Sequence, residues 1–121
     1  MYPWGDEAPN PRLANFSGSL IHEAVSVYRY PLGASPYGAF NMSGNAREWV
    51  ADWYDLKYYL SSPRTNPAGP EMGLEKSMRS GSYNEDGREI TVTHRYRHEP
   101  QSAGLSRGFR CAQDENSEYQ E

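Results

Sequence analysis

The sequence predicts a single α+β domain with short strands and little regular secondary structure. Its 121 residues suffice for one domain and are too few for two independent cores. Gly and Pro together make up 20 of 121 residues, about 17% against a usual ~12%, so long helices are interrupted. Ten Tyr and three Trp provide large anchors that bury much apolar area each. Three features thus indicate a loop-rich chain around a few aromatic contacts.

The first half of the chain is predicted to contain one strand and one helix. Residues 1–38 hold five prolines and four glycines, which predicts mostly loop, with a short strand over the Val- and Tyr-rich residues 25–30. Trp49 and Trp53 are four residues apart, and no Pro or Gly lies between them. This spacing is typical of an apolar helix face, so we expect a helix over 45–52, with a further turn near 56–60.

The second half is predicted to contain three strands. Residues 61–73 include three prolines and two glycines and indicate a long irregular connection. Strands are expected over 77–83 and 90–96, on either side of a turn at 84–87. A short final strand is expected over 108–112.

Charge argues against nucleic acid as a partner. The net charge of −4 lies in the last residues, 113–121, which contain four acidic and no basic side chains. Residues 1–112 are therefore neutral and lack the basic surplus that neutralises phosphates. No apolar run approaches the ~20 residues that span a bilayer. We expect a domain over 1–112 and a disordered acidic tail over 113–121, with neither nucleic acid nor a membrane as partner.

The cysteine content and the N-terminal sequence bear on the cellular compartment of the protein. Cys111 is the single cysteine, so no internal disulfide can form, and we expect it to be a small buried thiol. The N-terminal sequence lacks the basic and apolar regions of an export signal. We therefore expect a cytoplasmic protein. Its hydrophobic fraction of 36% is low for a self-sufficient core, so marginal stability is also expected.

Six motifs occur in one order along nearly the whole chain. They are YPWGDE (2–7), ANFSG (14–18), YGAFNMSGNAREWVADWY (37–54), NPAGP (66–70), MRSGSY (78–83) and GFRCA (108–112). This series resembles the formylglycine-generating-enzyme-like family, or sulfatase-modifying factor family, whose members read YPWG, GLYNMxGNVWEW, NPxGP, RGGSW and GFR. The resemblance implies a C-type-lectin-like fold with little regular structure. It also implies that the chain corresponds to the C-terminal half of such a domain, because full members carry a further part before YPWG.

The resemblance also bears on catalysis. The oxidases of the family place two cysteines after the RGGSY motif, and the matching positions here hold Glu85 and Ile90. Neither side chain can bind Cu(I) as a thiolate does or perform thiol chemistry. We therefore expect no catalytic residues of the oxidase type, no copper site and no formylglycine generation.

Residues 41–48 are a candidate calcium site. The side chains of Asn41 and Glu48 offer oxygen ligands, and Gly44 lets the chain turn so that carbonyls face inward. The family resemblance implies Asn41, the carbonyls of Gly44 and Ala46, and Glu48 as ligands of a structural calcium. The alternative is that Asn41 or Ser43 caps a helix and that Glu48 is a solvated helix residue.

Two weaker metal candidates follow from the same sequence. Asn15 with the carbonyl of Phe16 resembles half of a second calcium site, for which Glu23 is the only acidic candidate. His94 and His98 are four residues apart, but on a β-branched and aromatic strand this places them roughly 13 Å apart. A shared metal is therefore not expected for the histidines, and they are taken as ordinary surface or partner-facing residues.

The last third of the chain is a candidate binding surface. It is rich in Arg and Tyr, which are residue types that dominate interface hot spots. Arg79 and Arg110 are expected to be scaffold residues that pair with carboxylates such as Glu48 or Asp52. The candidate ligand-facing residues, for which a scaffold role is the alternative, are Tyr83, Asn84, Glu85, Arg88, His94 and Arg97.

These observations lead to two functional hypotheses. The first is a non-catalytic or catalytically incomplete domain, a pseudoenzyme, that acts as a calcium-stabilised binding module for a protein or small-molecule ligand. The second is the C-terminal portion of a nonheme-iron, oxygen-dependent enzyme of the sulfatase-modifying or ergothioneine-biosynthesis type. In both cases the chain is expected to self-associate or to require a complementing N-terminal half.

Overall fold

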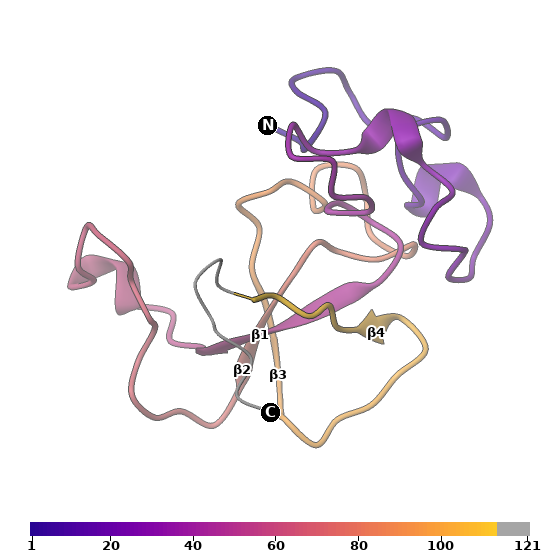
Figure 1. Ribbon diagram of the computed structural model, residues 1–121. Coiled ribbons are helices and arrows are strands. Elements are labelled where there is room, and N and C mark those ends of the chain that lie inside the picture. The colour runs from indigo at the N-terminus through magenta and orange to yellow at the C-terminus, as the bar shows by residue number, and fades with distance from the viewer. Residues whose placement is uncertain (114–121) are drawn as a thin grey trace, which may run out of the picture.

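The computed structural model describes residues 1–113, which form loops around a small sheet (Figure 1). The four strands are β1 (Arg47–Trp53), β2 (Lys76–Arg79), β3 (Tyr96–His98) and β4 (Arg107–Gly108), in the spatial order β3-β2-β1-β4. The helical elements of residues 1–113 are three single 3-10 turns: η1 (Ser17–Ser19), η2 (Pro31–Gly33) and η3 (Tyr58–Leu60). The loops before β1 gather at one end of the sheet. The predicted scarcity of regular structure is confirmed.

Strand pairing fixes which side chains share a face. β1 runs antiparallel to β2, with Glu48 opposite Arg79, and β2 runs antiparallel to β3, with Ser77 opposite Arg97. β4 joins the other edge of β1 in parallel. Because side chains alternate along a strand, Glu48 and Asp52 lie on the same sheet face as Arg79.

The predicted helix over 45–52 is wrong, because this segment is β1. A spacing of four is a multiple of two, so Trp49 and Trp53 share one face of a strand as readily as one face of a helix. Asn45 has a left-handed backbone, with φ of 67°, which prevents a helix from starting there. Pairing with strands on both sides then satisfies the backbone groups that a helix would have satisfied internally.

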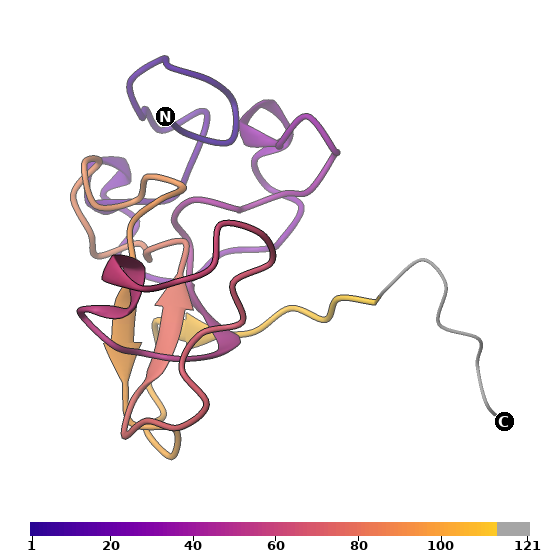
Figure 2. The ribbon, with the colours of Figure 1, turned by 90° about the vertical axis from the view of Figure 1, so that its left-hand side faces the viewer.

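The other predicted strands are shorter or displaced. Residues 25–30 are irregular, with a turn at residues 27 and 28, so the strand predicted there is wrong. β2 ends at Arg79, because Ser80 and Gly81 both have positive φ. The predicted strand over 90–96 begins only at Tyr96, and the predicted strand over 108–112 is reduced to β4. Figure 2 shows the chain leaving the sheet after β4.

The core is small and contains many polar groups. It forms where residues 13–15, 41–45 and 78–90 meet, and its apolar members are Leu13, Ala14, Tyr30, Met78, Tyr83 and Ile90. Asn15 is fully buried and donates from Nδ2 to Asn45 Oδ1 at 3.1 Å. Side-chain amides thus replace part of the backbone ladder that a more regular fold would use.

Gly44 is required by the packing of two of these loops. Its φ is +80°, and a Cβ at this position would lie 2.3 Å from the carbonyl oxygen of Asn15. Any larger residue would therefore force the loops at 15 and 44 apart.

Two sequence predictions concern the chain ends and the membrane. Apart from Gln113, the predicted acidic tail over 113–121 lies outside the described residues. Among the elements of residues 1–113, no helix has the length and apolar character needed to cross a bilayer.

Candidate functional site

The two positions at which the family resemblance implies the oxidase cysteines hold buried side chains. Glu85 is 6% exposed and forms an ion pair with Arg47, and its second carboxylate oxygen accepts a hydrogen bond from the amide of Ser82. Ile90 is completely buried. Both carboxylate oxygens of Glu85 are thus engaged by the protein. This arrangement offers neither a thiol nor an unpaired nucleophile.

Tyr96 completes the surroundings of this ion pair. The Arg47 guanidinium lies 4.4 Å from the centre of the Tyr96 ring, and the Tyr96 hydroxyl donates to the carbonyl of Glu89 at 2.7 Å. Burial raises the pKa of Tyr96, and the nearby carboxylates of Glu85 and Glu89 add to this effect. The phenol is therefore neutral at physiological pH and acts as a donor.

The candidate calcium site is a tight turn at the entrance to β1. Asn41 and Asn45 have left-handed backbones, and Asn41 Nδ2 donates to the carbonyl of Val27 at 2.6 Å. The remaining side-chain oxygen of Asn41, Oδ1, is buried without a hydrogen-bond partner. An unpaired buried oxygen is costly unless a cation or water satisfies it, so this atom suits a metal ligand.

Glu48, the charged member of the same site, is bound by Arg110. The Nε and Nη2 atoms of Arg110 each lie 2.5 Å from a carboxylate oxygen of Glu48, and Nη2 also donates to the carbonyls of Phe40 and Asn41. This hydrogen bonding raises the pKa of the Arg110 guanidinium. Oxygen atoms are the ligands that calcium prefers, but the carbonyl of Gly44 already accepts hydrogen bonds from Ser80 Oγ at 3.2 Å and from the amide of Ala46 at 3.0 Å. The charge of a calcium ion would also compete with that of Arg110 for Glu48.

The second calcium candidate has one feature in common with the first. Asn15 Oδ1 is also buried without a partner, while Asn15 Nδ2 donates to the carbonyl of Glu23 at 2.8 Å. Glu23 itself is exposed and approaches Asn15 through its main chain. Across residues 1–113, no three His, Cys, Asp or Glu side chains gather in a metal-binding arrangement.

The predicted ligand-facing residues fall into two groups. Tyr83 and Glu85 are buried, at 7% and 6% exposure, so neither faces a ligand at the surface. Asn84, Arg88 and Arg97 are exposed, and His94 is half-buried against the ring of Tyr96. Arg88 pairs with Asp86 in the loop after β2, whereas Arg97 pairs with Glu75 on the sheet, so the structure does not assemble the set into one site.

The remaining residues singled out by the sequence have mixed outcomes. Arg110 pairs with a carboxylate as predicted, whereas Arg79 donates to the carbonyls of Val92 and Thr93 instead. Cys111 is exposed, so the predicted buried thiol is wrong, because the chain has already left the sheet. His98 accepts a hydrogen bond at Nδ1 from the amide of Glu99.

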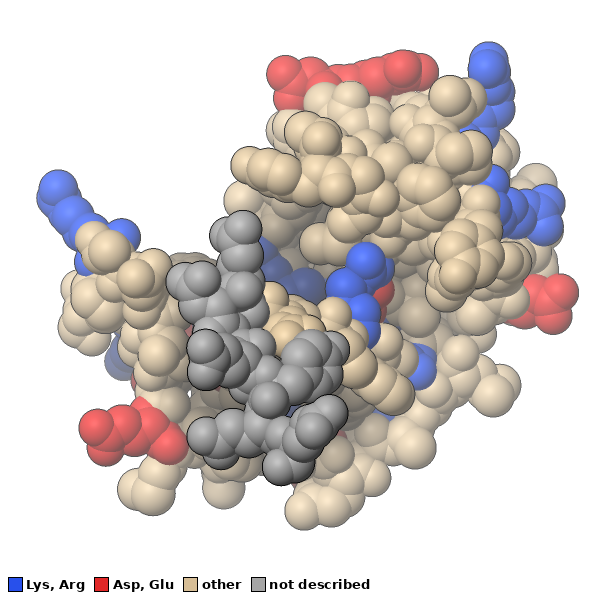
Figure 3. Space-filling model, in the orientation of Figure 1, with Lys and Arg blue, Asp and Glu red and all other residues tan. Residues whose placement is uncertain are grey.

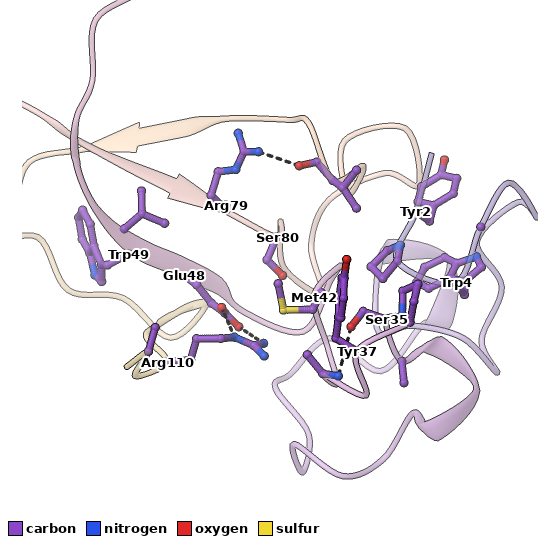
Figure 4. Close-up of a pocket in the computed structure, with 18 of the residues that line it drawn as sticks. Tyr2, Trp4, Ser35, Tyr37, Met42, Glu48, Trp49, Arg79, Ser80 and Arg110 are labelled. Carbon is purple, nitrogen blue, oxygen red and sulfur yellow. Dashed lines mark hydrogen bonds and ion pairs between the residues drawn. The ribbon is translucent and has the colours of Figure 1, made fainter. Parts of the chain in front are cut away.

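A large cavity of about 1170 Å³ lies between the N-terminal loops and β1 (Figure 4). Tyr2 and Trp4 stack with 5.2 Å between ring centres on one side, and Trp49 lies on the other. Tyr37 lines the cavity and is 97% exposed. Figure 3 shows a hollow between these loops and the sheet, with basic side chains at its floor.

A smaller cavity of about 260 Å³ lies further along the sheet, under the loop that follows β1. Asp52 and Arg79 line it from the sheet face, and Arg95 lines it from the residue that precedes β3. The sequence predicts only a scaffold role for Asp52, and nothing in it separates Arg95 from the other arginines of the last third of the chain. Strand alternation would have placed Asp52 with Arg79 if residues 47–53 had been recognised as a strand.

Together, the small mixed sheet, its long aromatic connections and the turn at 41–45 define a loop-rich domain of the formylglycine-generating-enzyme type. The chain belongs to the sulfatase-modifying factor enzyme 1-like domain family, whose model matches residues 1–115.

Individual relatives support this assignment. A serine/threonine-protein kinase pkn1 of Chlamydia pneumoniae is 34% identical over 117 residues, and a formylglycine-generating enzyme of Streptomyces coelicolor is 34% identical over 131 residues. These matches cover 95% and 93% of this chain, but 18% and 40% of the relatives. PvdO from Pseudomonas aeruginosa has the same fold, with a TM-score of 0.72 and 22% identity over 90% of this chain and 42% of that one. The chain therefore spans less than half the length of these proteins.

Proposed function

We propose that this domain is a non-catalytic, calcium-stabilised binding module of its family. The observation that carries the proposal is the Glu85–Arg47 ion pair at the first of the two cysteine positions. Its carboxylate is held by a guanidinium and a backbone amide, and the second position is the buried apolar Ile90. Residues that could exchange electrons or attack a substrate are replaced by residues that hold the loop in place.

Calcium would contribute stability in this proposal. Asn41, the carbonyls of Gly44 and Ala46, and Glu48 would hold the ion, and the unpaired Oδ1 of Asn41 supports their role. The ion would fix the turn that enters β1. Its function would be structural, since no reacting group adjoins these four residues in the proposed module.

The binding surface would lie on the side of the sheet that carries β3. Arg97 is exposed there, and its guanidinium lies 5.1 Å from the ring of Tyr54. Arg and Tyr side chains held against one another lose little freedom on binding, which suits contact with a protein or small-molecule ligand.

The proposal is tested by an oxidase assay with mass-spectrometric detection. A peptide with a sulfatase-type cysteine is incubated with this protein and copper, and in parallel with the Streptomyces coelicolor enzyme as a positive control. We expect the control alone to convert cysteine to formylglycine. Conversion by this protein at a comparable rate would overturn the non-catalytic assignment.

A further inference from the structure

The smaller cavity beside the sheet contains two opposite charges that have no ion-pair partner within residues 1–113. Its charged lining comes from Asp52, Arg79 and Arg95. Arg79 is fixed, because it donates to the carbonyls of Thr93 and Val92 at 3.2 and 2.7 Å. Asp52 and Arg95 are both half-buried. The aromatic side chains that enclose the cavity are Trp53, Tyr58 and Tyr59.

Arg95 is held in place by aromatic rings. Its guanidinium lies 4.9 Å from the ring centre of Tyr54 and 4.1 Å from that of Tyr59. Within residues 1–113 the side chain has no ion pair and no hydrogen bond, so its N–H donors are available. A guanidinium stacked in this way is oriented before a ligand arrives, which lowers the entropy cost of binding a carboxylate.

Asp52 offers the complementary group. It stands on the face of β1 that also lines the cavity, and within residues 1–113 its carboxylate has neither an ion pair nor a hydrogen bond. The loop at Gly69 packs closely on its Cβ, so the backbone around it is confined. The cavity thus contains a half-buried carboxylate and a half-buried guanidinium that do not pair with each other. A ligand that carries both a cationic and an anionic group would pair with both of them.

We propose that this cavity binds an α-amino acid with an apolar side chain, as a zwitterion. The ligand's carboxylate would accept hydrogen bonds from Arg95, and its ammonium would donate to Asp52. The side chain would pack against Tyr58 and Tyr59, which also line the cavity. A volume of about 260 Å³ equals that of roughly nine waters, which suits a molecule of amino-acid size.

A ligand with a single charge would pair with only one of the two charged side chains of the cavity. A plain anion would leave Asp52 unpaired beside a second negative charge, and a plain amine would do the same to Arg95. A nucleotide or a folded partner exceeds the volume. This inference deepens the binding role proposed above and rests on it.

The experiment compares three ligands that share one side chain. L-Phenylalanine carries both charges, 3-phenylpropionate carries only the carboxylate, and phenethylamine carries only the ammonium. Binding to the whole chain is followed by calorimetry and by chemical-shift changes of the tryptophan indoles. We expect phenylalanine to bind at least about tenfold more tightly than either analogue, because each analogue loses one charge-assisted contact.

Two variants assign the contacts. Arg95→Gln should remove the preference for phenylalanine over phenethylamine, and Asp52→Asn should remove its preference over 3-phenylpropionate. Arg64→Gln is the matched control, because Arg64 is exposed on the loop that follows β1 but does not line the cavity. Unchanged melting temperatures and near-ultraviolet circular dichroism show that each variant is folded.

The outcomes separate this inference from the proposed function. Equal affinity for the three ligands, no saturation by phenylalanine at about 50 mM, or an equal loss in Arg64→Gln overturns the amino-acid site. None of these results alters the oxidase assay. Conversely, formylglycine production would overturn the non-catalytic assignment whatever binds beside Arg95.

Discussion

At the scale of single residues, the stability of the domain depends on charges that the core contains. The carboxylate of Glu85 is almost fully buried, while the side chain of Arg47 is 26% exposed. A buried charge that loses its partner retains the full cost of its desolvation. The two side chains are 38 residues apart in sequence, so they join the loop after β2 to the start of β1.

Removing one member of this pair should destabilise the domain strongly. We expect Arg47→Met to lower the free energy of unfolding by about 3 kcal/mol, as for other broken buried pairs. The double variant Arg47→Met/Glu85→Met should recover part of this loss, because no charge is left unpaired. Urea denaturation measures both. Asp86→Asn, which breaks an exposed pair with Arg88, is the control and should leave the midpoint unchanged. Equal midpoints for all variants would contradict a structural role of the pair.

Tyr96 should make the domain sensitive to alkali. Its pKa is raised in the folded protein, so the unfolded chain releases the phenolic proton first, at about pH 10. Its contribution to stability is therefore complete below about pH 10 and is lost as the pH rises above this value. We expect the melting temperature of Tyr96→Phe to fall less steeply than that of the wild type between about pH 10 and 11. Thermal unfolding monitored by circular dichroism measures this difference. If the melting temperatures of the two proteins fall in parallel as the pH rises, the Tyr96 phenol is not the cause of the sensitivity to alkali.

At the scale of elements, the turn at 41–45 and strand β1 act as one unit. The turn ends in left-handed Asn45, and Glu48 follows on the strand, where Arg110 reaches it from beyond β4. In the proposed calcium site, the ion and the guanidinium would share a single carboxylate. Substitutions of Glu48 and Arg110 should therefore change the response to calcium in opposite directions.

Calcium should raise the melting temperature of the wild-type domain. With one formal charge among the ligands, the dissociation constant should lie near ~0.1–1 mM, so calcium at 100 times this value should add about 2.7 kcal/mol. Glu48→Ala should abolish the effect, and Arg110→Gln should shift the half-maximal response to lower calcium. Magnesium is the control ion, and we expect it to substitute poorly, since carbonyls on a turn rarely meet its octahedral geometry. A melting curve that neither calcium nor chelation moves would refute the site.

The elements also show what the sequence could predict. The motif order and the Gly, Pro and Tyr content were sufficient to predict the family, the fold and the scarcity of regular structure. The type of element at 47–53 was missed, because Trp49 and Trp53 fit either period and the pairing partners of β1 come from distant parts of the chain. The Glu85–Arg47 pair was missed for the same reason: local patterns do not reveal contacts that tertiary packing creates.

At the scale of the whole molecule, the domain exposes more surface than a protein of its size normally does. Its accessible area is 8874 Å², whereas a compact chain of 13.7 kDa exposes about 6600 Å². An excess of about 1200 Å² remains even if residues 114–121 are counted as a fully extended chain. A standard interface buries about 800 Å² on each partner, so the excess is large enough for one.

This excess leads us to expect association of the isolated chain. The large cavity beside Tyr2, Trp4 and Tyr37 offers an aromatic surface for contact with another copy or with a complementing half. Tyr37→Asp should reduce the mass measured by analytical ultracentrifugation and remove the concentration dependence of the melting temperature. Leu105→Asp, at 93% exposure and outside the cavity, is the control. A wild-type monomer with a sharp, concentration-independent transition would refute association.

The parallel pairing of β4 with β1 has a consequence for synthesis on the ribosome. β1 occupies an inner position in the sheet, yet its neighbour on one side is a two-residue strand that is translated about sixty residues later. Until residues 107–110 leave the exit tunnel, one edge of β1 is unpaired and Glu48 lacks its guanidinium. One edge of β1 therefore stays open during synthesis until residues 107–110 have emerged, so formation of the complete sheet is delayed by the sequence separation of its two paired strands.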